Sequence, residues 1–355
     1  MAFTCAWSGG KVTVALPVTV IESGVRWAGC VCAKTLRAVP AKNSTTSGAT
    51  SGRAARNLLT ILASDLSVSS ILRYGNDRGI ASAAKGVKIE GMDNRPIGFL
   101  DSGVGAVSLW RAARSLLPAE SAVLAADGRC FPYGALPPQA VCERAMQLTA
   151  ALLEQDVKLI VVACNTASVH ALARLRAAFP SIPFVGIVPV VKVLSEQTRC
   201  GTIAMLSTPS TAESAYLADL VRQFAPDRRL VNVPCPGLAE LVEAGDAGSE
   251  RLAVTLAGYL EPVQASGADV LGLGCTHYIF LRDALARLLG PRVRIYDAAL
   301  PVARRIEALL RQRDALACHA APEDRFLTTG DLDGFASAVR ALLGEPLETV
   351  QFGPL

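Results

Sequence analysis

Two cysteines of this sequence each close an apolar run and are followed at once by hydrogen-bonding side chains. Cys164 ends the run 159–163 and precedes Asn165-Thr166, whereas Cys275 ends the run 270–274 and precedes Thr276-His277. Such runs predict strands buried in a parallel sheet, and the amphipathic segments after them predict helices. Each thiol is therefore expected on a strand-to-helix turn, where open α/β sheets bind ligands. Because a helix N-terminus lowers the pKa of a thiol from about 8.5, the two cysteines are a candidate acid and base.

The remaining cysteines give no comparable signal, because unpaired cysteine is most often a small buried hydrophobe. Five of the ten have neighbours that suggest no shared chemistry, namely Cys130, Cys142, Cys200, Cys235 and Cys318. With three histidines, no CxxC pair and a Cys30-Val31-Cys32 spacing too tight for a zinc knuckle, no metal site is expected. The thiols are expected to be reduced, in a cytoplasmic protein.

Composition and charge exclude several classes of protein. A chain of 355 residues with 51% hydrophobic content can bury a large core, and its length suggests two domains. The net charge of +4 divides into +7 for residues 1–91 (11 Lys/Arg, 4 Asp/Glu) and −3 for residues 92–355 (24 Lys/Arg, 27 Asp/Glu). Residues 92–355 therefore do not resemble a nucleic-acid surface, which needs a clustered basic stripe. No run reaches the roughly 18 apolar residues that span a bilayer, so neither nucleic acid nor membrane is an expected partner.

Residues 1–91 differ from the rest of the chain. The segment 42–56 is rich in Ser, Thr, Gly and Ala, as flexible linkers are, and residues 57–72 predict at most a short helix. Met92 stands four residues before a strong strand pattern, and the charge changes sign there. We therefore expect residues 1–91 to be a disordered or non-native N-terminal extension, such as a translated upstream region. A targeting peptide is the alternative, because the region contains Arg and Ser and few acids.

From residue 97 onward, strand and helix patterns alternate. Strands are predicted at 97–100, 122–126, 159–164, 184–188, 203–207, 230–233, 270–273 and 294–296. Helices are predicted between them, among others at 107–117, 139–154 and 167–179. This alternation predicts an α/β protein with doubly wound parallel sheets and right-handed crossovers.

The segment Asp101-Ser102-Gly103-Val104-Gly105 follows the first predicted strand. It lacks the third glycine position of the dinucleotide fingerprint, which argues against a bound dinucleotide. A carboxylate accepts a hydrogen bond from an ammonium group, and a hydroxyl with free backbone N–H groups holds a carboxylate. An amino acid offers both groups, so Asp101 and Ser102 indicate an amino-acid site.

Five motifs together resemble the cofactor-independent glutamate racemases of the aspartate/glutamate racemase superfamily. They stand in that family's order between about residues 95 and 352: FLDSGVG at 99–105, PYG at 132–134, VACNTAS at 162–168, CP at 235–236 with LVEAG at 241–245, and LGCTHY at 273–278. The resemblance implies a bacterial enzyme that converts L-glutamate to D-glutamate for peptidoglycan. It also implies two similar α/β domains with the active site between them, which we place at 92–189 with 298–355 and at 190–297.

The resemblance also assigns roles to individual residues. Cys164 and Cys275 become the proton donor and acceptor, and the matching substrate contacts are Asp101, Ser102, Tyr133, Gly134, Asn165, Thr166, Thr276 and His277. His277 is a candidate to support deprotonation of Cys275, and Asp101 to do so for Cys164 or to bind the substrate ammonium. Thr208, Thr211 and Glu243 are further candidate substrate contacts. The two threonines are equally well explained as helix caps, and Glu243 as a solvated carboxylate at a helix end.

The chemistry of racemisation agrees with two thiols. One base cannot easily take a proton from one face of a planar carbanion and return another to the opposite face, whereas two thiols can. No pyridoxal lysine motif is evident, so no cofactor is expected. Two departures from the family pattern are Ala106, where a second glycine is usual, and Val188, where a glutamate commonly precedes the proline.

Alternative functions remain open at this point. A racemase of another acidic amino acid such as aspartate would share both cysteines, and a noncatalytic amino-acid-binding protein would keep the cleft. A related decarboxylase is disfavoured, because it can operate with a single thiol. The sequence does not fix the oligomeric state, a homodimer being possible.

Overall fold

The computed structural model divides into two units, Met1–Glu90 and Gly91–Leu355. The residues that it describes are 5–8, 11–14, 36–37, 92–188, 190–245, 249–318, 321–344, 347 and 350–355. In the first unit these form an antiparallel sheet of β1 (Cys5–Ser8), β2 (Lys11–Val14) and β3 (Leu36–Arg37). The predicted linker 42–56 and helix 57–72 lie outside the described residues. That residues 1–91 are an extension stays a prediction.

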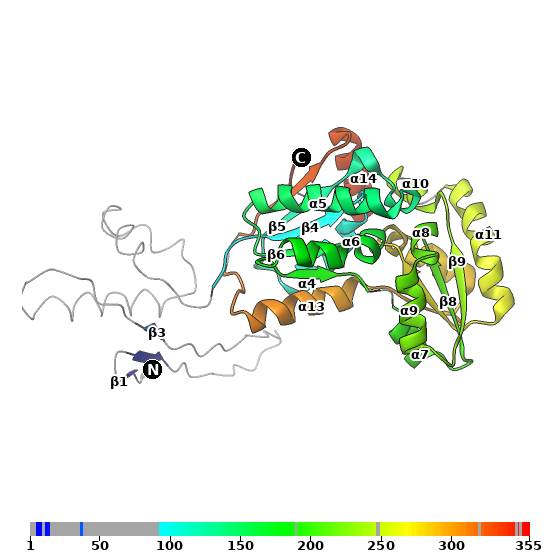
Figure 1. Ribbon diagram of the computed structural model, residues 1–355, viewed down its shortest axis with the longest axis horizontal. Helices are drawn as coiled ribbons and strands as arrows, with labels where there is room; N and C mark the ends of the chain where they lie inside the picture. The colour runs from blue at the N-terminus through cyan, green and yellow to red at the C-terminus, as the bar shows by residue number, and fades with distance from the viewer. Residues whose placement is uncertain are drawn as a thin grey trace, which may run out of the picture. The chain divides into compact units, whose positions relative to one another are not determined.

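The second unit contains a six-stranded parallel sheet to which both its first and its last strands belong (Figure 1). Its strand order is β13-β12-β5-β4-β6-β7, and every neighbouring pair is parallel. The strands are β4 (Ile97–Asp101), β5 (Ala122–Ala126), β6 (Leu159–Val162), β7 (Phe184–Gly186), β12 (Asp324–Thr328) and β13 (Val350–Pro354). All residues of β4, β5 and β6 are buried, as expected for strands covered on both faces.

A second parallel sheet of four strands has the order β11-β10-β8-β9. These strands are β8 (Thr202–Ser207), β9 (Arg229–Pro234), β10 (Val270–Gly274) and β11 (Arg294–Tyr296). All eight strands predicted between residues 97 and 296 are present, with ends shifted by at most two residues. The expected α/β architecture with parallel sheets is therefore what the structure shows.

Helices cover both faces of each sheet, as doubly wound topology requires. They are α4 (Ala106–Leu116), α5 (Pro138–Glu154), α6 (Asn165–Ala178), α7 (Val191–Gln197), α8 (Pro209–Ala212), α9 (Ala215–Phe224), α10 (Leu238–Glu243), α11 (Glu250–Ser266), α12 (Arg282–Leu289), α13 (Ala299–Gln312) and α14 (Leu332–Leu343). Alternate residues of β4 point to opposite faces, so Phe99 packs in the cluster of α4 and α13 and Leu100 in that of α5 and α6. None of the described helices combines the length and apolar character that a membrane crossing needs.

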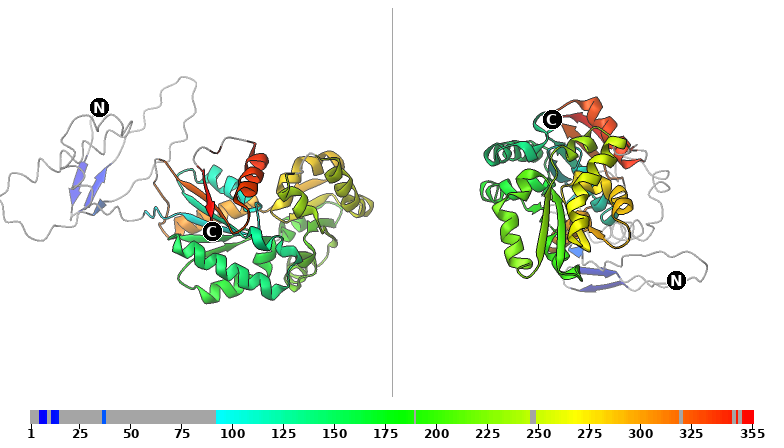
Figure 2. Two further views of the ribbon diagram at one scale, coloured as in Figure 1. Left: turned by 90° about the horizontal axis from the view of Figure 1, so that it is seen from above. Right: turned by 90° about the vertical axis from the view of Figure 1, so that its right-hand side faces the viewer.

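The chain returns to the six-stranded sheet after building the four-stranded one. Following β11, helix α13 packs against α4, and β12 then pairs with β5. In Figure 2 the orange and red C-terminal elements lie in the same lobe as the cyan strands. We call the six-stranded sheet with α4–α6, α13 and α14 the first lobe, and the four-stranded sheet with α7–α12 the second lobe. The domain boundaries expected from the sequence stay a prediction.

A buried ion pair lies at the amino end of the first sheet, where Lys158 Nζ is 2.6 Å from Glu120 Oε2 and both residues are 5% exposed. Lys158 also donates to the carbonyls of Asp93 and Ala315 at 2.6 and 2.8 Å. Glu120 in turn accepts from the Ala317 N–H at 2.8 Å. The pair thus ties the segment after α13 to the start of the sheet.

We expect Lys158→Met to lower the free energy of unfolding by about 3–5 kcal/mol, because it leaves a buried carboxylate without its partner. Urea unfolding of the parent and the variant measures the change. Lys192→Met is the control, since Lys192 pairs with Glu196 at 3.9 Å on the surface and both side chains are more than half exposed. That surface pair is worth less than about 1 kcal/mol. Equal losses of unfolding free energy in the two variants would contradict the prediction that the buried pair matters more to stability than the surface pair.

Candidate active site

The carboxyl ends of adjacent strands bring the predicted site residues together. In the first lobe, β4 ends at Asp101 and its neighbour β6 leads to Cys164. In the second lobe, β10 leads to Cys275 and its neighbour β8 leads to Thr208. Because parallel strands end at one edge of a sheet, each lobe presents one thiol with polar side chains around it.

Cys164 is the N-cap residue of α6 and is 6% exposed. Its Sγ accepts a hydrogen bond from the Ala167 N–H at 3.5 Å, as expected at a helix N-terminus. Burial nevertheless raises the pKa of Cys164 well above its ordinary value, and the charges of Asp101 and Cys275 act in the same direction. Cys164 is therefore a protonated thiol at neutral pH.

Cys275 is also 6% exposed, and its Sγ lies 3.9 Å from Nδ1 of His277. The other ring nitrogen, Nε2, is 2.7 Å from Oε2 of Glu243 at the end of α10. Burial opposes protonation of His277, but Cys275 and Glu243 outweigh it and raise the pKa of His277 well above 6.5. A thiol, an imidazole and a carboxylate thus form one chain of contacts.

Two sets of hydrogen bonds join the lobes at this site. The Thr276 hydroxyl donates to Oδ2 of Asp101 at 3.1 Å, and the Val104 N–H donates to Oε2 of Glu243 at 3.0 Å. Asp101 is fully buried and also accepts from the Ser102 N–H at 2.7 Å. Burial raises the pKa of Asp101 to about 6 although these bonds and His277 favour its ionised form. The end of β4 and the loop after it therefore meet the segment that carries Cys275.

A third group of site residues lies between β5 and α5. Tyr133 is fully buried, and its hydroxyl donates to Oδ2 of Asp127 at 2.8 Å. Asp127 also accepts two bonds from Arg144, at 2.7 and 2.6 Å, and one from Thr329 at 2.7 Å. This buried carboxylate fixes the loop that brings Gly134 against the second lobe, where an added Cβ would lie 2.7 Å from Thr208 Cβ.

Three buried hydroxyls form a cluster across the lobes, with Thr166 Oγ1 3.0 Å from Thr208 and 3.4 Å from Thr211. Thr208 is also the N-cap of α8 and accepts from the Thr211 N–H at 3.3 Å, so it has the helix-capping role as well.

Asn165 is 4% exposed, and its Nδ2 has no hydrogen-bond partner among the described residues. An unpaired buried amide is costly and points to a missing acceptor. His170 bonds Ser210 at 2.8 Å.

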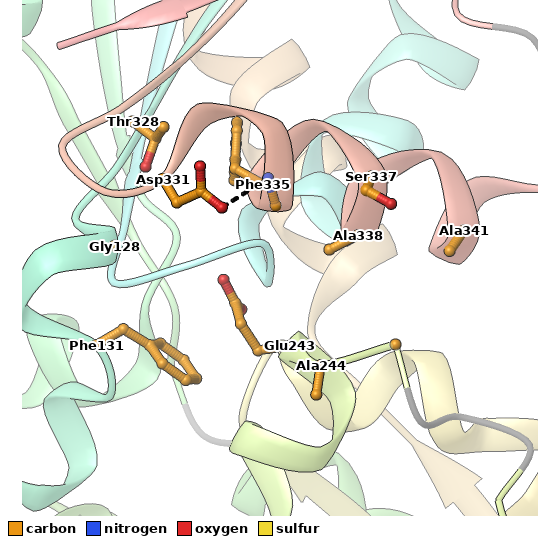
Figure 3. A pocket seen from close by; sticks show the side chains of 12 residues that line it. Gly128, Phe131, Glu243, Ala244, Thr328, Asp331, Phe335, Ser337, Ala338 and Ala341 are labelled. Atoms are coloured by element: carbon orange, nitrogen blue, oxygen red, sulfur yellow. Dashed lines mark hydrogen bonds between the residues drawn. The ribbon is translucent and has the colours of Figure 1, made fainter.

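A cavity of about 590 Å³ opens beside this site (Figure 3). Glu243 and Phe131 line one side of it, and α14 with the loop before it lines the other. Phe131 belongs to the loop between β5 and α5, and its ring stacks against His277 with centroids 5.2 Å apart. In the part of the chain that the structure describes, no group of three or more His, Cys, Asp or Glu side chains is arranged to hold a metal ion.

Comparison with known proteins agrees with this architecture. The sequence model of the Asp/Glu/Hydantoin racemase family matches residues 108–305. The glutamate racemase of Pseudomonas entomophila is 43% identical over 260 residues, which are 73% of this chain and 98% of that protein. The chain belongs to the glutamate racemase family.

Solved structures of the glutamate racemase family have the same fold. A glutamate racemase isoform from Bacillus anthracis superposes with a TM-score of 0.68 and 29% identity, over 74% of this chain and 98% of that one. Glutamate racemase from Escherichia coli, solved with L-glutamate and the activator UDP-MurNAc-ala, gives 0.66 and 30% identity, over 74% and 98%. The predicted fold class and family resemblance are thereby confirmed.

A helical segment follows each thiol, as predicted, but the two segments differ. After Cys275 it begins as a 3₁₀ turn, η3 (His277–Leu281), which leads directly into α12. Its i→i+3 bonds begin with the Tyr278 N–H on the Cys275 carbonyl, and the Tyr278 hydroxyl is held by the Cys235 carbonyl. At Cys164 the α-helix begins directly, but the predicted lowering of its thiol pKa is wrong, because burial raises that pKa instead. The two thiols therefore sit in different environments.

The sequence patterns did not single out Asp127 or Phe131. Asp127 directly follows β5 as Asp101 ends β4, so a carboxylate at a strand end was an available signal. Phe131 carried no such signal, because its partner His277 lies 146 positions along the chain.

Asp101→Asn tests the electrostatics of the site through stability. The folded-state pKa of Asp101, about 6, lies above its ordinary 3.8, so its contribution to stability is fully present below 3.8 and lost as pH rises through 6. At pH 8 the variant, which carries no buried charge, is expected to exceed the parent's unfolding free energy by up to about 3 kcal/mol. Below pH 4 the difference vanishes. Urea unfolding at both pH values measures it, and a less stable variant at pH 8 contradicts the prediction.

Proposed function

We propose that this chain interconverts L- and D-glutamate with Cys164 and Cys275 as the two proton carriers. The observation that carries this proposal is the pair of buried thiols at the strand ends of different lobes. Thr276, next to Cys275, donates to Asp101 at the end of β4, the strand that pairs with the β6 strand before Cys164. The charge on Cys275 also affects the pKa of Cys164, so the two sulfurs are electrostatically coupled. The relatives named glutamate racemase, one of them solved with L-glutamate, support glutamate as the substrate.

The two environments suit one thiolate and one thiol. The protonated imidazole of His277, 3.9 Å from Cys275 Sγ, favours negative charge on that sulfur, whereas Cys164 holds its proton. In one direction the Cys275 thiolate takes the α-proton and the Cys164 thiol donates its own proton to the opposite face. The carbon loses one proton and gains one, and the negative charge moves from one sulfur to the other. The reverse reaction exchanges the roles.

The remaining site residues supply binding groups. The unpaired amide of Asn165 and the cluster of Thr166, Thr208 and Thr211 offer donors for the substrate carboxylates. Asp101 accepts hydrogen bonds at the strand end and offers a carboxylate for the ammonium group. Fixed donors in a closed site stabilise the charge that develops as the weakly acidic α-proton leaves.

Deuterium wash-in tests the proposal. L-glutamate incubated with the protein in heavy water is expected to gain α-deuterium as the optical rotation disappears. L-aspartate and buffer alone serve as controls. Exchange with aspartate but not glutamate redirects the proposal to another acidic amino acid, and binding without exchange indicates a noncatalytic amino-acid-binding protein.

The predicted extension can be tested with the same assay. We propose that the reaction runs in the cytoplasm, supplies D-glutamate for peptidoglycan and does not require residues 1–91. The P. entomophila relative supports the last of these points, because 73% of this chain is enough to cover 98% of that protein. A chain that begins at Met92 is expected to racemise glutamate within about twofold of the parent rate. Its failure to fold would contradict this proposal.

A further inference from the structure

The side chain of Phe131 contacts His277. The proposed roles of the two thiols and of the substrate-binding groups do not account for this contact. The ring comes from the first lobe, whereas the imidazole belongs to the second, and the two planes are tilted by 39° with centroids 5.2 Å apart. Phe131 is half-buried, whereas His277 is 2% exposed. The Phe131 ring therefore covers part of the imidazole that solvent would otherwise reach.

The cavity beside the site explains why this cover matters. Phe131 and Glu243 both line the cavity, but His277 does not (Figure 3). The two ring nitrogens of His277 are occupied, Nε2 by Glu243 and Nδ1 by Cys275. The Phe131 ring packs against the same imidazole, tilted by 39° to its plane. The ring and the Glu243 carboxylate therefore stand between the cavity and the imidazole.

We propose that Phe131 is a positioning residue, whose ring closes His277 off from the cavity and holds the imidazole between Glu243 and Cys275. This inference rests on the proposed function, in which His277 supports negative charge on Cys275. Phe131 itself exchanges no proton.

The direction of the effect follows from the groups around His277. The charged or titratable groups that act on it are Glu243 from α10, Cys275 after β10 and Asp101 from β4. Burial lowers the pKa of His277, but Cys275 and Glu243 raise it further, to well above 6.5. Water admitted from the cavity weakens burial and these interactions alike, so the pKa falls back toward 6.5. The imidazole then loses its proton at lower pH, and the alkaline limb of the rate profile moves with it.

Racemisation of glutamate by Phe131→Ala, followed in both directions from pH 6 to pH 10, tests the inference. We expect kcat to fall about tenfold with KM within about twofold, and the alkaline limb of kcat to move down by about one pH unit. Phe131→Tyr keeps the ring and is expected to restore the parent profile. Phe224→Ala is the matched control, because it removes a half-buried ring from α9 that contacts Lys192, outside the site.

The outcomes separate this inference from the function on which it rests. A parent that does not racemise glutamate overturns the proposed function and this inference with it. A parent that does, with an alkaline limb that stays in place in Phe131→Ala, overturns the inference alone, even if kcat falls. Should Phe131→Ala not fold, Phe131→Val also removes the ring and is judged by the same shift.

Discussion

Cys164→Ala and Cys275→Ala are each expected to lower the rate of racemisation at least about 1,000-fold, because each removes one of the two proton carriers. The remaining thiol still faces one side of the α-carbon. Each variant should therefore exchange the α-proton of one glutamate enantiomer with heavy water without inverting it, and the two variants should prefer opposite enantiomers. Separate assays with L- and D-glutamate, read by NMR and by optical rotation, measure both quantities.

The matched control for these variants is Cys142→Ala. Cys142 is 5% exposed, and its Sγ donates to the carbonyl of His170 in α6 at 3.0 Å. All three substitutions remove one buried sulfur and are expected to cost about 1 kcal/mol of stability. Cys142→Ala should keep the parent rate. Near-normal turnover in both directions by either active-site variant would refute the role assigned to that cysteine.

Gly105→Ala is expected to lower kcat about 100-fold and to destabilise the fold by about 1–3 kcal/mol. Gly105 has φ −54° and ψ −37°, which alanine adopts freely, so the backbone presents no obstacle. The added Cβ, however, would lie 2.3 Å from Thr276 Oγ1, 2.6 Å from His277 Nδ1 and 2.8 Å from Asp101 Oδ2. One methyl group therefore displaces the contacts between the lobes.

Gly258→Ala separates this steric effect from a general effect of replacing glycine. Gly258 lies inside α11, and an added Cβ there meets no atom within 4 Å. That variant should keep the parent rate and gain about 0.5–1 kcal/mol in unfolding free energy. Kinetics and urea unfolding of both variants give the comparison. Parental kinetics in Gly105→Ala would show that the loops do not meet as described.

The sequence was sufficient for the strands that carry the site. Continuous apolar runs such as 159–162 and 270–274 match β6 and β10, because a strand buried on both faces has no polar alternation to obscure it. β12 and β13 were not predicted individually. The residues of β12 alternate between buried and half-buried, whereas those of β13, at the sheet edge, are half-buried or exposed, so both patterns are weak. The helix predicted after Cys275 begins as the 3₁₀ turn η3, and its apolar residues do not distinguish a 3₁₀ helix from an α-helix.

The chemistry of the site was less predictable than its location. Motifs supplied the thiols and their polar neighbours, but the pKa of a thiol depends on how completely it is buried, which a local pattern does not contain. The partners of His277 were equally hidden, since Glu243 and Phe131 come from distant segments. Asp127 directly follows a predicted strand, but this position alone did not reveal its role, because its partners Arg144 and Thr329 are assembled only by the fold.

The return of the chain to the first lobe sets an order of events during biosynthesis. β5 hydrogen-bonds β4 on one side and β12 on the other, and β12 is translated almost 200 residues after β5. While the ribosome makes the whole second lobe, β5 is an edge strand that exposes unpaired amides and carbonyls to other nascent chains. Residues 324–355 therefore remove this exposed edge only when synthesis reaches them, so the nascent chain is open to aggregation until β12 pairs with β5.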